Sequence, residues 1–318
     1  MTSPHTFGGD WTEQKLEILK QYLSAYTTAL KNKPFKTAYI DAFAGTGTRR
    51  TRPKNAPKQM VSSEDQISFI QDKDEIKLAS EPIQQFLDGS ARIALQSSPP
   101  FDRYIFIEKS AKRAQELKVL ETDFAQFAER ITIQREDANL AIQKLCKPDW
   151  SARPAVPGRG AIRARRAVLF LDPYGMQVEW KTIKMIAGTK AIDLWVLFPI
   201  GAVVRMRTRT GRVSASWKDR LNSLFGTHDW YERFYRTEIN NTIFGPEEQT
   251  VPEKTEVIGA YFLERLRTCF AGVAANPAVL RNSKNSQLYL LCFAVGNPAG
   301  AAPALKIASS ILKKMGSW

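Results

Sequence analysis

The fold is decided by the stretch AVLFLDPYG at residues 167–175. Five apolar residues in an unbroken run, Ala167–Leu171, are typical of a strand that is covered on both faces. The proline and the glycine that follow favour a turn directly after this strand. The stretch therefore predicts a buried strand of a parallel sheet, with Asp172 at the point where the strand ends.

Other short apolar runs recur along the chain, and helical patterns separate them. Residues 11–31, for example, place apolar side chains at the spacing of one helix face. Strands that alternate with helices build a mostly parallel sheet with helices on both faces. The stretch SQLYLLCFAV at 286–295 predicts a late antiparallel strand, whose partner we expect around Leu266–Val273. The remaining predicted strands lie at 38–40, 103–108, 131–135 and 192–199.

The length of 318 residues and the single series of alternating elements predict one α/β domain over residues 1–318. We expect basic insertions to interrupt the alternation of strands and helices. The predicted parts are an N-terminal helical region at 1–36, an insertion after the first strand at 49–100, a basic and aromatic helical insertion at 201–265, and C-terminal strands with a helix at 266–318.

Composition excludes several classes of protein. Hydrophobic residues make up 43% of the chain and charged residues 25%, an ordinary globular composition that excludes a wholly disordered chain. The longest apolar stretch, at 191–204, is shorter than the roughly 20 residues that span a bilayer, so we expect no membrane span. Lys plus Arg number 46 and Asp plus Glu 32. The resulting net charge of +14 favours nucleic acid or another polyanion as a partner.

The cysteines and histidines narrow the chemistry further. Cys146, Cys269 and Cys292 lie far apart, so they predict neither a disulfide framework nor a metal-binding pair. We see no secretory signal near the start of the chain and expect a cytoplasmic protein. His5 and His228 lie near no Ser or Cys motif. This argues against a hydrolase with a catalytic triad and against a zinc site.

Acidic or glycine-rich motifs follow four of the predicted strands. They are DAFAGTG at 41–47, Glu108, EDAN at 136–139 and DPYG at 172–175. The carboxyl ends of parallel strands meet at one edge of the sheet, where such folds bind ligands. Glycines let the backbone approach a ligand closely, and a carboxylate accepts hydrogen bonds from both ribose hydroxyls. The chain lacks the GxGxxG and Walker A spacings, so the prediction of a cofactor site rests on the four motifs together.

These motifs resemble those of a known superfamily. DAFAGTG, FIE, REDAN and LFLDPYG look like successive motifs of the class I S-adenosylmethionine-dependent methyltransferases. Across nearly the whole chain, WTEQKLEIL, YIDAFAGTG, LFLDPYG, YLLCFAVGNP and LKIA resemble the three-Cys-motif partner protein family. The resemblance implies a Rossmann-like class I methyltransferase sheet, S-adenosylmethionine as the cofactor, and a three-Cys-motif protein as a partner.

The resemblance also implies roles for individual residues. Glu108 would hold the ribose of the cofactor, and Asp137, with Asn139 beside it, would face the adenine. The residues expected around the methionine part are Asp41, Phe43, Gly45 and Gly47.

Asp172, Pro173 and Tyr174 resemble the Asp-Pro-Pro-aromatic motif of amino-group methyltransferases. In that motif, an acidic oxygen and a backbone carbonyl accept hydrogen bonds from the target nitrogen, and the aromatic ring stacks on the base. In this chain the aromatic residue is third in the motif, and a glycine follows it. We expect Asp172 to position the nucleophile.

Basic loops follow the first and fifth predicted strands, on the side of the expected site. They predict contacts to phosphates, with a tryptophan that could stack on a base. The predicted nucleic-acid-binding residues are Arg49, Arg50, Arg205, Arg207, Arg209 and Trp217. The sequence thus predicts a methyltransferase of nucleic acid. The alternatives are a methyltransferase of a small molecule or protein, and a non-catalytic partner subunit that binds the cofactor or nucleic acid.

Overall fold

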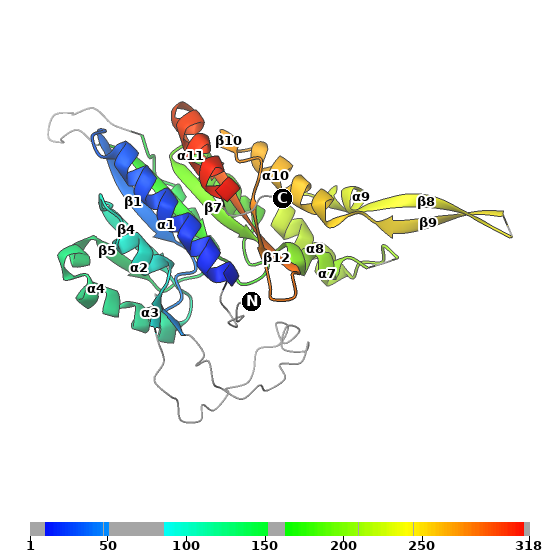
Figure 1. Ribbon diagram of the computed structural model, residues 1–318, viewed down its shortest axis with the longest axis horizontal. Helices are drawn as coiled ribbons and strands as arrows, with labels where there is room; N and C mark the ends of the chain where they lie inside the picture. The colour runs from blue at the N-terminus through cyan, green and yellow to red at the C-terminus, as the bar shows by residue number, and fades with distance from the viewer. Residues whose placement is uncertain are drawn as a thin grey trace, which may run out of the picture.

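The computed structural model describes residues 10–46, 48–50, 86–151, 163–208, 210–243 and 245–314. One sheet of eight strands forms its centre (Figure 1). Five strands run parallel in the order β5-β4-β1-β6-β7, and β12 joins antiparallel beside β7. The short strands β10 and β11 pair with the outer edge of β12. The strands are β1 (Phe35–Asp41), β4 (Arg103–Ile107), β5 (Ile131–Gln134), β6 (Ala164–Leu171), β7 (Ile192–Phe198), β10 (Gly272–Val273), β11 (Ala278–Arg281) and β12 (Gln287–Val295).

This strand order confirms the predicted fold, a Rossmann-like, mostly parallel sheet with an antiparallel C-terminal strand. The chain runs outward from β1 through β4 to β5, then returns to the other side of β1 and continues through β6 to β7. The order of the strands therefore reverses between β1 and β6. In open α/β sheets, ligands bind beside the carboxyl ends of the strands at such a reversal.

Helices cover both faces of the sheet. On one face, α1 (Asp10–Leu30) packs beside α11 (Ala301–Lys314), as the blue and red helices of Figure 1 show. Successive residues of β6 point to opposite faces, so Val168 and Phe170 join the core under α1. Leu169 and Leu171 join the other core. The other helices are α2 (Ser90–Leu95), α3 (Ala111–Leu117), α4 (Val119–Asp123), α5 (Ala138–Cys146), α6 (Trp180–Gly188), α7 (Ile200–Met206), α8 (Ala215–Phe225), α9 (Trp230–Phe234) and α10 (Thr255–Arg267), with 3-10 turns at Ala125–Arg130 and Pro298–Gly300.

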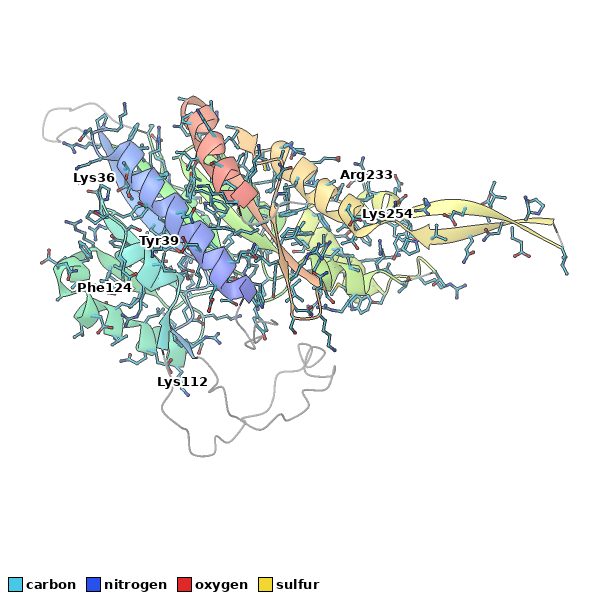
Figure 2. All side chains as sticks on the ribbon, in the orientation of Figure 1. Lys36, Tyr39, Lys112, Phe124, Arg233 and Lys254 are labelled. Atoms are coloured by element: carbon cyan, nitrogen blue, oxygen red, sulfur yellow. The ribbon has the colours of Figure 1, made fainter. Side chains whose placement is uncertain are left out.

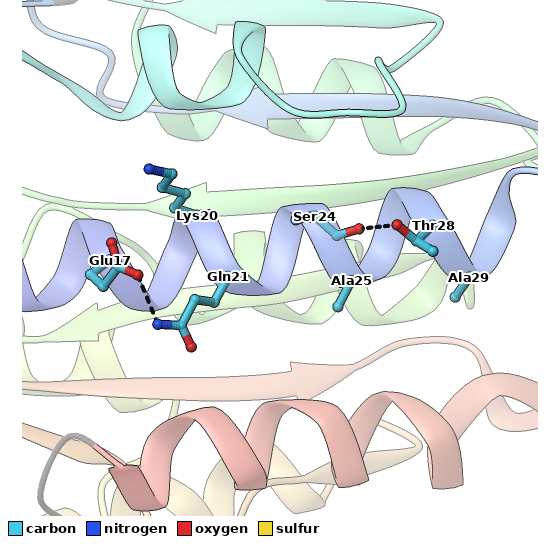
Figure 3. A pocket seen from close by; sticks show the side chains of 7 residues that line it. All are labelled: Glu17, Lys20, Gln21, Ser24, Ala25, Thr28 and Ala29. Carbon is cyan, nitrogen blue, oxygen red and sulfur yellow. Dashed lines mark hydrogen bonds between the residues drawn. The ribbon is translucent and has the colours of Figure 1, made fainter.

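A pocket lies on the outer side of α1, which packs between α2 and α11 (Figure 3). Polar side chains and two alanines line it, and two hydrogen bonds run along the helix. The lining residues are Glu17, Lys20, Gln21, Ser24, Ala25, Thr28 and Ala29. In the part of the chain that the structure describes, no helix is long and apolar enough to cross a membrane.

Two predicted elements differ from the structure. The segment 201–265 is not helical throughout, because β8 (Tyr235–Thr242) and β9 (Gly245–Pro252) form a hairpin within it. The aromatic helical spacing ends at Phe234, and the threonines, asparagines and isoleucines beyond it form helices less readily.

The predicted strand at Leu266–Val273 is also wrong for its first residues. Leu266 is fully buried in the core as the last apolar residue of α10, since it continues the helical spacing of Ile258, Phe262 and Leu263. Only Gly272–Val273 pair with β12, and Ala278–Arg281 form the longer partner.

A buried polar contact anchors α1 to the sheet. The Tyr22 hydroxyl of α1 donates to Asp193 Oδ2 of β7 at 2.8 Å, and both residues are buried. The Tyr22 ring also packs against Trp195 and Phe293, with centroids 5.2 and 4.9 Å away. Burial raises the pKa of the Asp193 carboxyl to about 6. The folded chain therefore keeps a proton on Asp193 at a pH where the unfolded chain has released it.

Because of this raised pKa, we expect the free energy of unfolding to fall as pH rises. Asp193→Asn should remove this pH dependence. As pH rises from about 4 to about 6, the wild type should lose up to roughly 3 kcal/mol of unfolding free energy relative to Asp193→Asn. Urea unfolding across this pH range measures the difference, with Asp219→Asn on the exposed side of α8 as the matched control. A difference that stays constant with pH would contradict the raised pKa.

Candidate functional site

Three strands end level with one another at the carboxyl edge of the sheet. Asp41 of β1 lies opposite Phe106 of β4 on one side and Phe170 of β6 on the other. Glu108 and Asp172 each come two residues after these partners. The parallel register thus brings three predicted acidic residues to one place, and the charge of Asp172 acts on Asp41.

The loop after β1 lies across the ends of both neighbouring strands. The backbone N–H of Ala42 donates to Phe170 O at 3.1 Å, and that of Ala44 donates to Ile107 O at 3.1 Å. Gly45 has a left-handed φ of +60°, which favours glycine, and the space that a side chain would take there is open. Phe43 is half-buried against the core, and Gly47 lies outside the described residues. The loop therefore exposes backbone near Gly45 that a ligand can approach.

Glu108 is buried and held by three donors. Its Oε2 accepts the Gly45 N–H at 3.1 Å. Its Oε1 accepts the Ser110 N–H at 2.7 Å and the Arg113 Nη2 at 2.9 Å. A carboxylate has about four acceptor positions, so three donors leave one for a ligand. The Arg113 side chain is 55% exposed, so it can move without disturbing the core.

Asp137 and Asn139 have different surroundings. Asp137 Oδ1 caps α5 by accepting the N–H groups of Asn139 and Leu140, while Oδ2 lies 3.7 Å from Lys109 Nζ. The Asn139 side-chain amide donates to Gln177 O and accepts from the Glu179 N–H and from a threonine hydroxyl. Asn139 thus ties α5 to the segment before α6, whereas Asp137 Oδ2 faces Lys109, the residue that follows Glu108.

Asp41 is fully buried, so it faces the interior more than a ligand. Its carboxylate accepts the Ser90 hydroxyl at 2.5 Å, the Phe43 N–H at 3.2 Å and the Tyr39 hydroxyl at 3.4 Å. Burial raises the pKa of Asp41 to about 6, and the nearby Asp172 charge adds to this effect. Asp41 thus joins β1 to the start of α2 and shapes the loop that carries Gly45.

Asp172 forms an ion pair that the sequence pattern does not predict. Lys15 of α1 is buried, and its Nζ binds Asp172 Oδ2. The same Nζ lies 5.0 Å from the centre of the Trp11 ring, which stacks on Tyr289 of β12 at 5.4 Å. Burial raises the pKa of Tyr289, and the Asp172 charge adds to this. A cation and two aromatic rings therefore flank the predicted catalytic carboxylate.

The sequence does contain a pattern that indicates a buried partner for Lys15. Lys15, Ile18 and Tyr22 follow one another at helical spacing, so a charged residue stands within the apolar stripe that α1 buries. Lysine is almost never fully buried without a partner, so its position predicts an acidic residue nearby.

The other predicted residues fall into separate groups. Pro173 is buried and Tyr174 is 63% exposed. Arg205 is exposed and acts electrostatically on Tyr289.

Arg207 is half-buried at the base of the hairpin, where burial lowers the pKa of its guanidinium. Trp217 packs against the core. Arg49 and Arg50 belong to β2 (Thr48–Arg50), which pairs with β3 (Phe86–Asp88), and Arg209 lies outside the described residues. Arg205 and Asp172 both act electrostatically on Tyr289, which places this predicted nucleic-acid contact on the Asp172 side of the site.

Among the described residues, no group of His, Cys, Asp and Glu side chains could hold a metal ion. The groups that the site presents are carboxylates, an ammonium group, aromatic rings and open backbone.

Comparisons with known proteins find similarity in structure. No protein-family model and no curated protein sequence matches the chain. A Legionella pneumophila protein of the DUF519 family is 13% identical, with 97% of this chain and 93% of that chain covered and a TM-score of 0.49. Magnesium protoporphyrin IX methyltransferase from Synechocystis with bound SAH is 11% identical, with 79% and 88% covered and a TM-score of 0.31. The methyltransferase domain of a bacterial Hen1 is 9% identical, with 88% and 99% covered and a TM-score of 0.35.

At these identities and TM-scores, the fold assignment rests on the strand order of the sheet itself. The resemblance to the three-Cys-motif partner family stays a prediction.

The ion pair between Lys15 and Asp172 predicts strong energetic coupling. Removing either partner leaves the other charge partly buried and uncompensated. The sum of the losses in Lys15→Met and Asp172→Asn should therefore exceed the loss in the double variant by about 1–3 kcal/mol of unfolding free energy. Urea unfolding of the four proteins measures this coupling.

The pair of Lys36 and Asp102 is the matched control, since both of its side chains are more exposed. Exposed pairs contribute only about 0.2–1 kcal/mol. A coupling between Lys15 and Asp172 no larger than the control coupling would contradict the buried ion pair.

Proposed function

We propose that the chain is an S-adenosylmethionine-dependent methyltransferase that acts on nucleic acid. The observation that carries the proposal is the convergence of Glu108, Asp172 and the open Gly45 backbone at the reversal of the strand order. Hydroxyl and amino groups of a nucleoside are suitable donors for carboxylates at this edge.

The side chains at the edge fit this cofactor. Glu108 has one acceptor position for a ribose hydroxyl and gains a second where the exposed Arg113 side chain moves away. Asp137 Oδ2 can accept from the adenine amino group. Phe43 and Gly45, with Asp41 behind them, would border the methionine part. When bound, the sulfonium of this cofactor supplies an electrophilic methyl group, so the protein itself needs no nucleophile.

The chain's own part in the reaction is to orient the acceptor. Lys15 holds Asp172 Oδ2, which leaves Oδ1 to accept a hydrogen bond from the acceptor's N–H or O–H group. Such a bond fixes the direction of the acceptor lone pair, and alignment of reacting groups supplies much of the rate in reactions of this kind. Trp11 and Tyr289 cover one side of the ion pair and limit the access of water.

Charge supports nucleic acid as the acceptor. The chain carries a net charge of +14, and the exposed Arg205 lies near the acceptor side of the site. Arginine there can bind a phosphate while Tyr174, which is largely exposed, borders the acceptor. A base within a duplex would have to be flipped out to reach Asp172. Association with a three-Cys-motif protein is part of this proposal on the sequence resemblance alone.

Transfer of labelled methyl groups tests the reaction. The isolated chain, given methyl-labelled S-adenosylmethionine with RNA, DNA, protein and metabolite extracts, should label nucleic acid. Transfer should fall steeply with added salt, because phosphate contacts release counterions. Asp172→Asn should abolish transfer and keep cofactor binding, with Asp219→Asn as the control. Label in protein or small molecules would contradict the nucleic-acid acceptor, and no transfer without a partner would contradict an autonomous enzyme.

Glu108→Gln tests the cofactor site separately. Loss of a hydrogen-bonded charge costs about 1.5–3 kcal/mol, so the affinity for S-adenosylhomocysteine should fall about 10–100-fold. Calorimetric titration measures it, with Glu129→Gln as the control, because this exposed residue precedes β5 at the amino end of the strand. Equal affinities in the two variants would remove Glu108 from the cofactor site.

A further inference from the structure

The hairpin of β8 and β9 projects away from the body of the molecule (Figure 1). Its two strands pair without interruption from Tyr235 opposite Pro252 to Thr242 opposite Gly245. They form a sheet of their own, and no other strand of the described residues joins them. A two-stranded ribbon with both faces in water is marginally stable at best, so contacts from outside the hairpin would stabilise it.

The outer part of the hairpin exposes large apolar side chains. Ile243 is 94% exposed and Ile239 is 66% exposed, the highest values among the large hydrophobic residues that the structure describes. Both lie within one short stretch of the β8–β9 hairpin, called the arm below. This closeness makes them a candidate contact surface.

Charge along the arm is strongly uneven. Residues 237–249 contain three glutamates and no lysine or arginine, although the chain as a whole carries +14. Arg236 pairs with Glu238, so Glu247 and Glu248 carry the acidic charge of the outer part. Phosphates would be repelled by this part of the arm. The arm therefore fits a basic protein surface and not nucleic acid.

Such a basic surface lies at the base of the same arm. Figure 2 shows Lys254 there, just beyond the end of β9. Lys218 of α8 lies over the Tyr231 ring. The Tyr231 hydroxyl donates to Gly211 O at 3.0 Å, and Gly211 is so close to Thr250 of β9 that a side chain on it would touch that residue. These contacts place Lys218 beside the base of the arm. The exposed basic residues of this region outnumber its exposed acidic residues Asp219 and Glu256, and they are Arg212, Lys218, Arg220 and Lys254.

We propose that two copies of this chain associate through their hairpins, with the arms side by side and antiparallel. In this arrangement the acidic, isoleucine-bearing end of each arm lies on the basic base of the other. A two-fold axis makes the two contacts identical, so each copy gives and receives the same interaction. Opposite charges at the two ends of one arm fix this antiparallel orientation, because the parallel one would place like charges together.

The mass of the full-length chain in solution tests the arrangement. Light scattering at low salt should give about twice the single-chain mass of 35.9 kDa. High salt should weaken the association, because it screens exposed charges. The double variants Ile239→Ser with Ile243→Ser and Glu247→Lys with Glu248→Lys should both lose the dimer. Glu121→Lys with Glu129→Lys, which makes the same charge change on exposed residues outside the hairpin, should keep it.

Mixing two charge-reversed variants gives the sharpest result. Lys218→Glu with Arg220→Glu should also be a single chain, since an acidic arm would then meet an acidic base. Its mixture with Glu247→Lys, Glu248→Lys should restore the double mass, because both contacts again join opposite charges. A wild type of single-chain mass at every salt and protein concentration would overturn the proposal, as would a mixture that stays unassociated.

Discussion

Three parallel strands that end level with one another carry the whole candidate site. Because β1 lies between β4 and β6 in register, carboxylates from three distant parts of the sequence meet at one edge. Such a group of like charges needs compensation, and each carboxylate has its own positively charged or hydrogen-bonding partner. Lys15 pairs with Asp172, Arg113 pairs with Glu108, and the Ser90 hydroxyl binds the buried Asp41.

Helix α1 is held to the sheet by polar contacts at two levels. Tyr22 binds Asp193 near the start of β7, and Lys15 binds Asp172 beyond the end of β6. Between these contacts the helix buries an apolar stripe in the core that it shares with β6 and β12. The first helix thus belongs to the site as well as to the fold, and stability and site geometry are coupled through it.

Sequence patterns predict the parts of this structure that depend on local order. The apolar run before Asp172 and the motif DAFAGTG place the strands and their ends correctly, because strand period and turn residues are local properties. Lys15 and Tyr289 escape prediction as neighbours of Asp172, since α1 and β12 reach it only through tertiary packing. The hairpin is missed for a related reason, because helical aromatic spacing up to Phe234 hides the change to strand at Tyr235.

The central claim is that the carboxyl ends of β1, β4 and β6 bind a nucleoside cofactor. A crystal structure of the chain with S-adenosylhomocysteine measures this directly. We predict the ribose hydroxyls within hydrogen-bonding distance of Glu108, the backbone at Gly45 against the ligand, and the sulfur facing Asp172. A ligand bound elsewhere, or a Glu108 carboxylate that keeps all its protein donors and touches no part of the ligand, would contradict it.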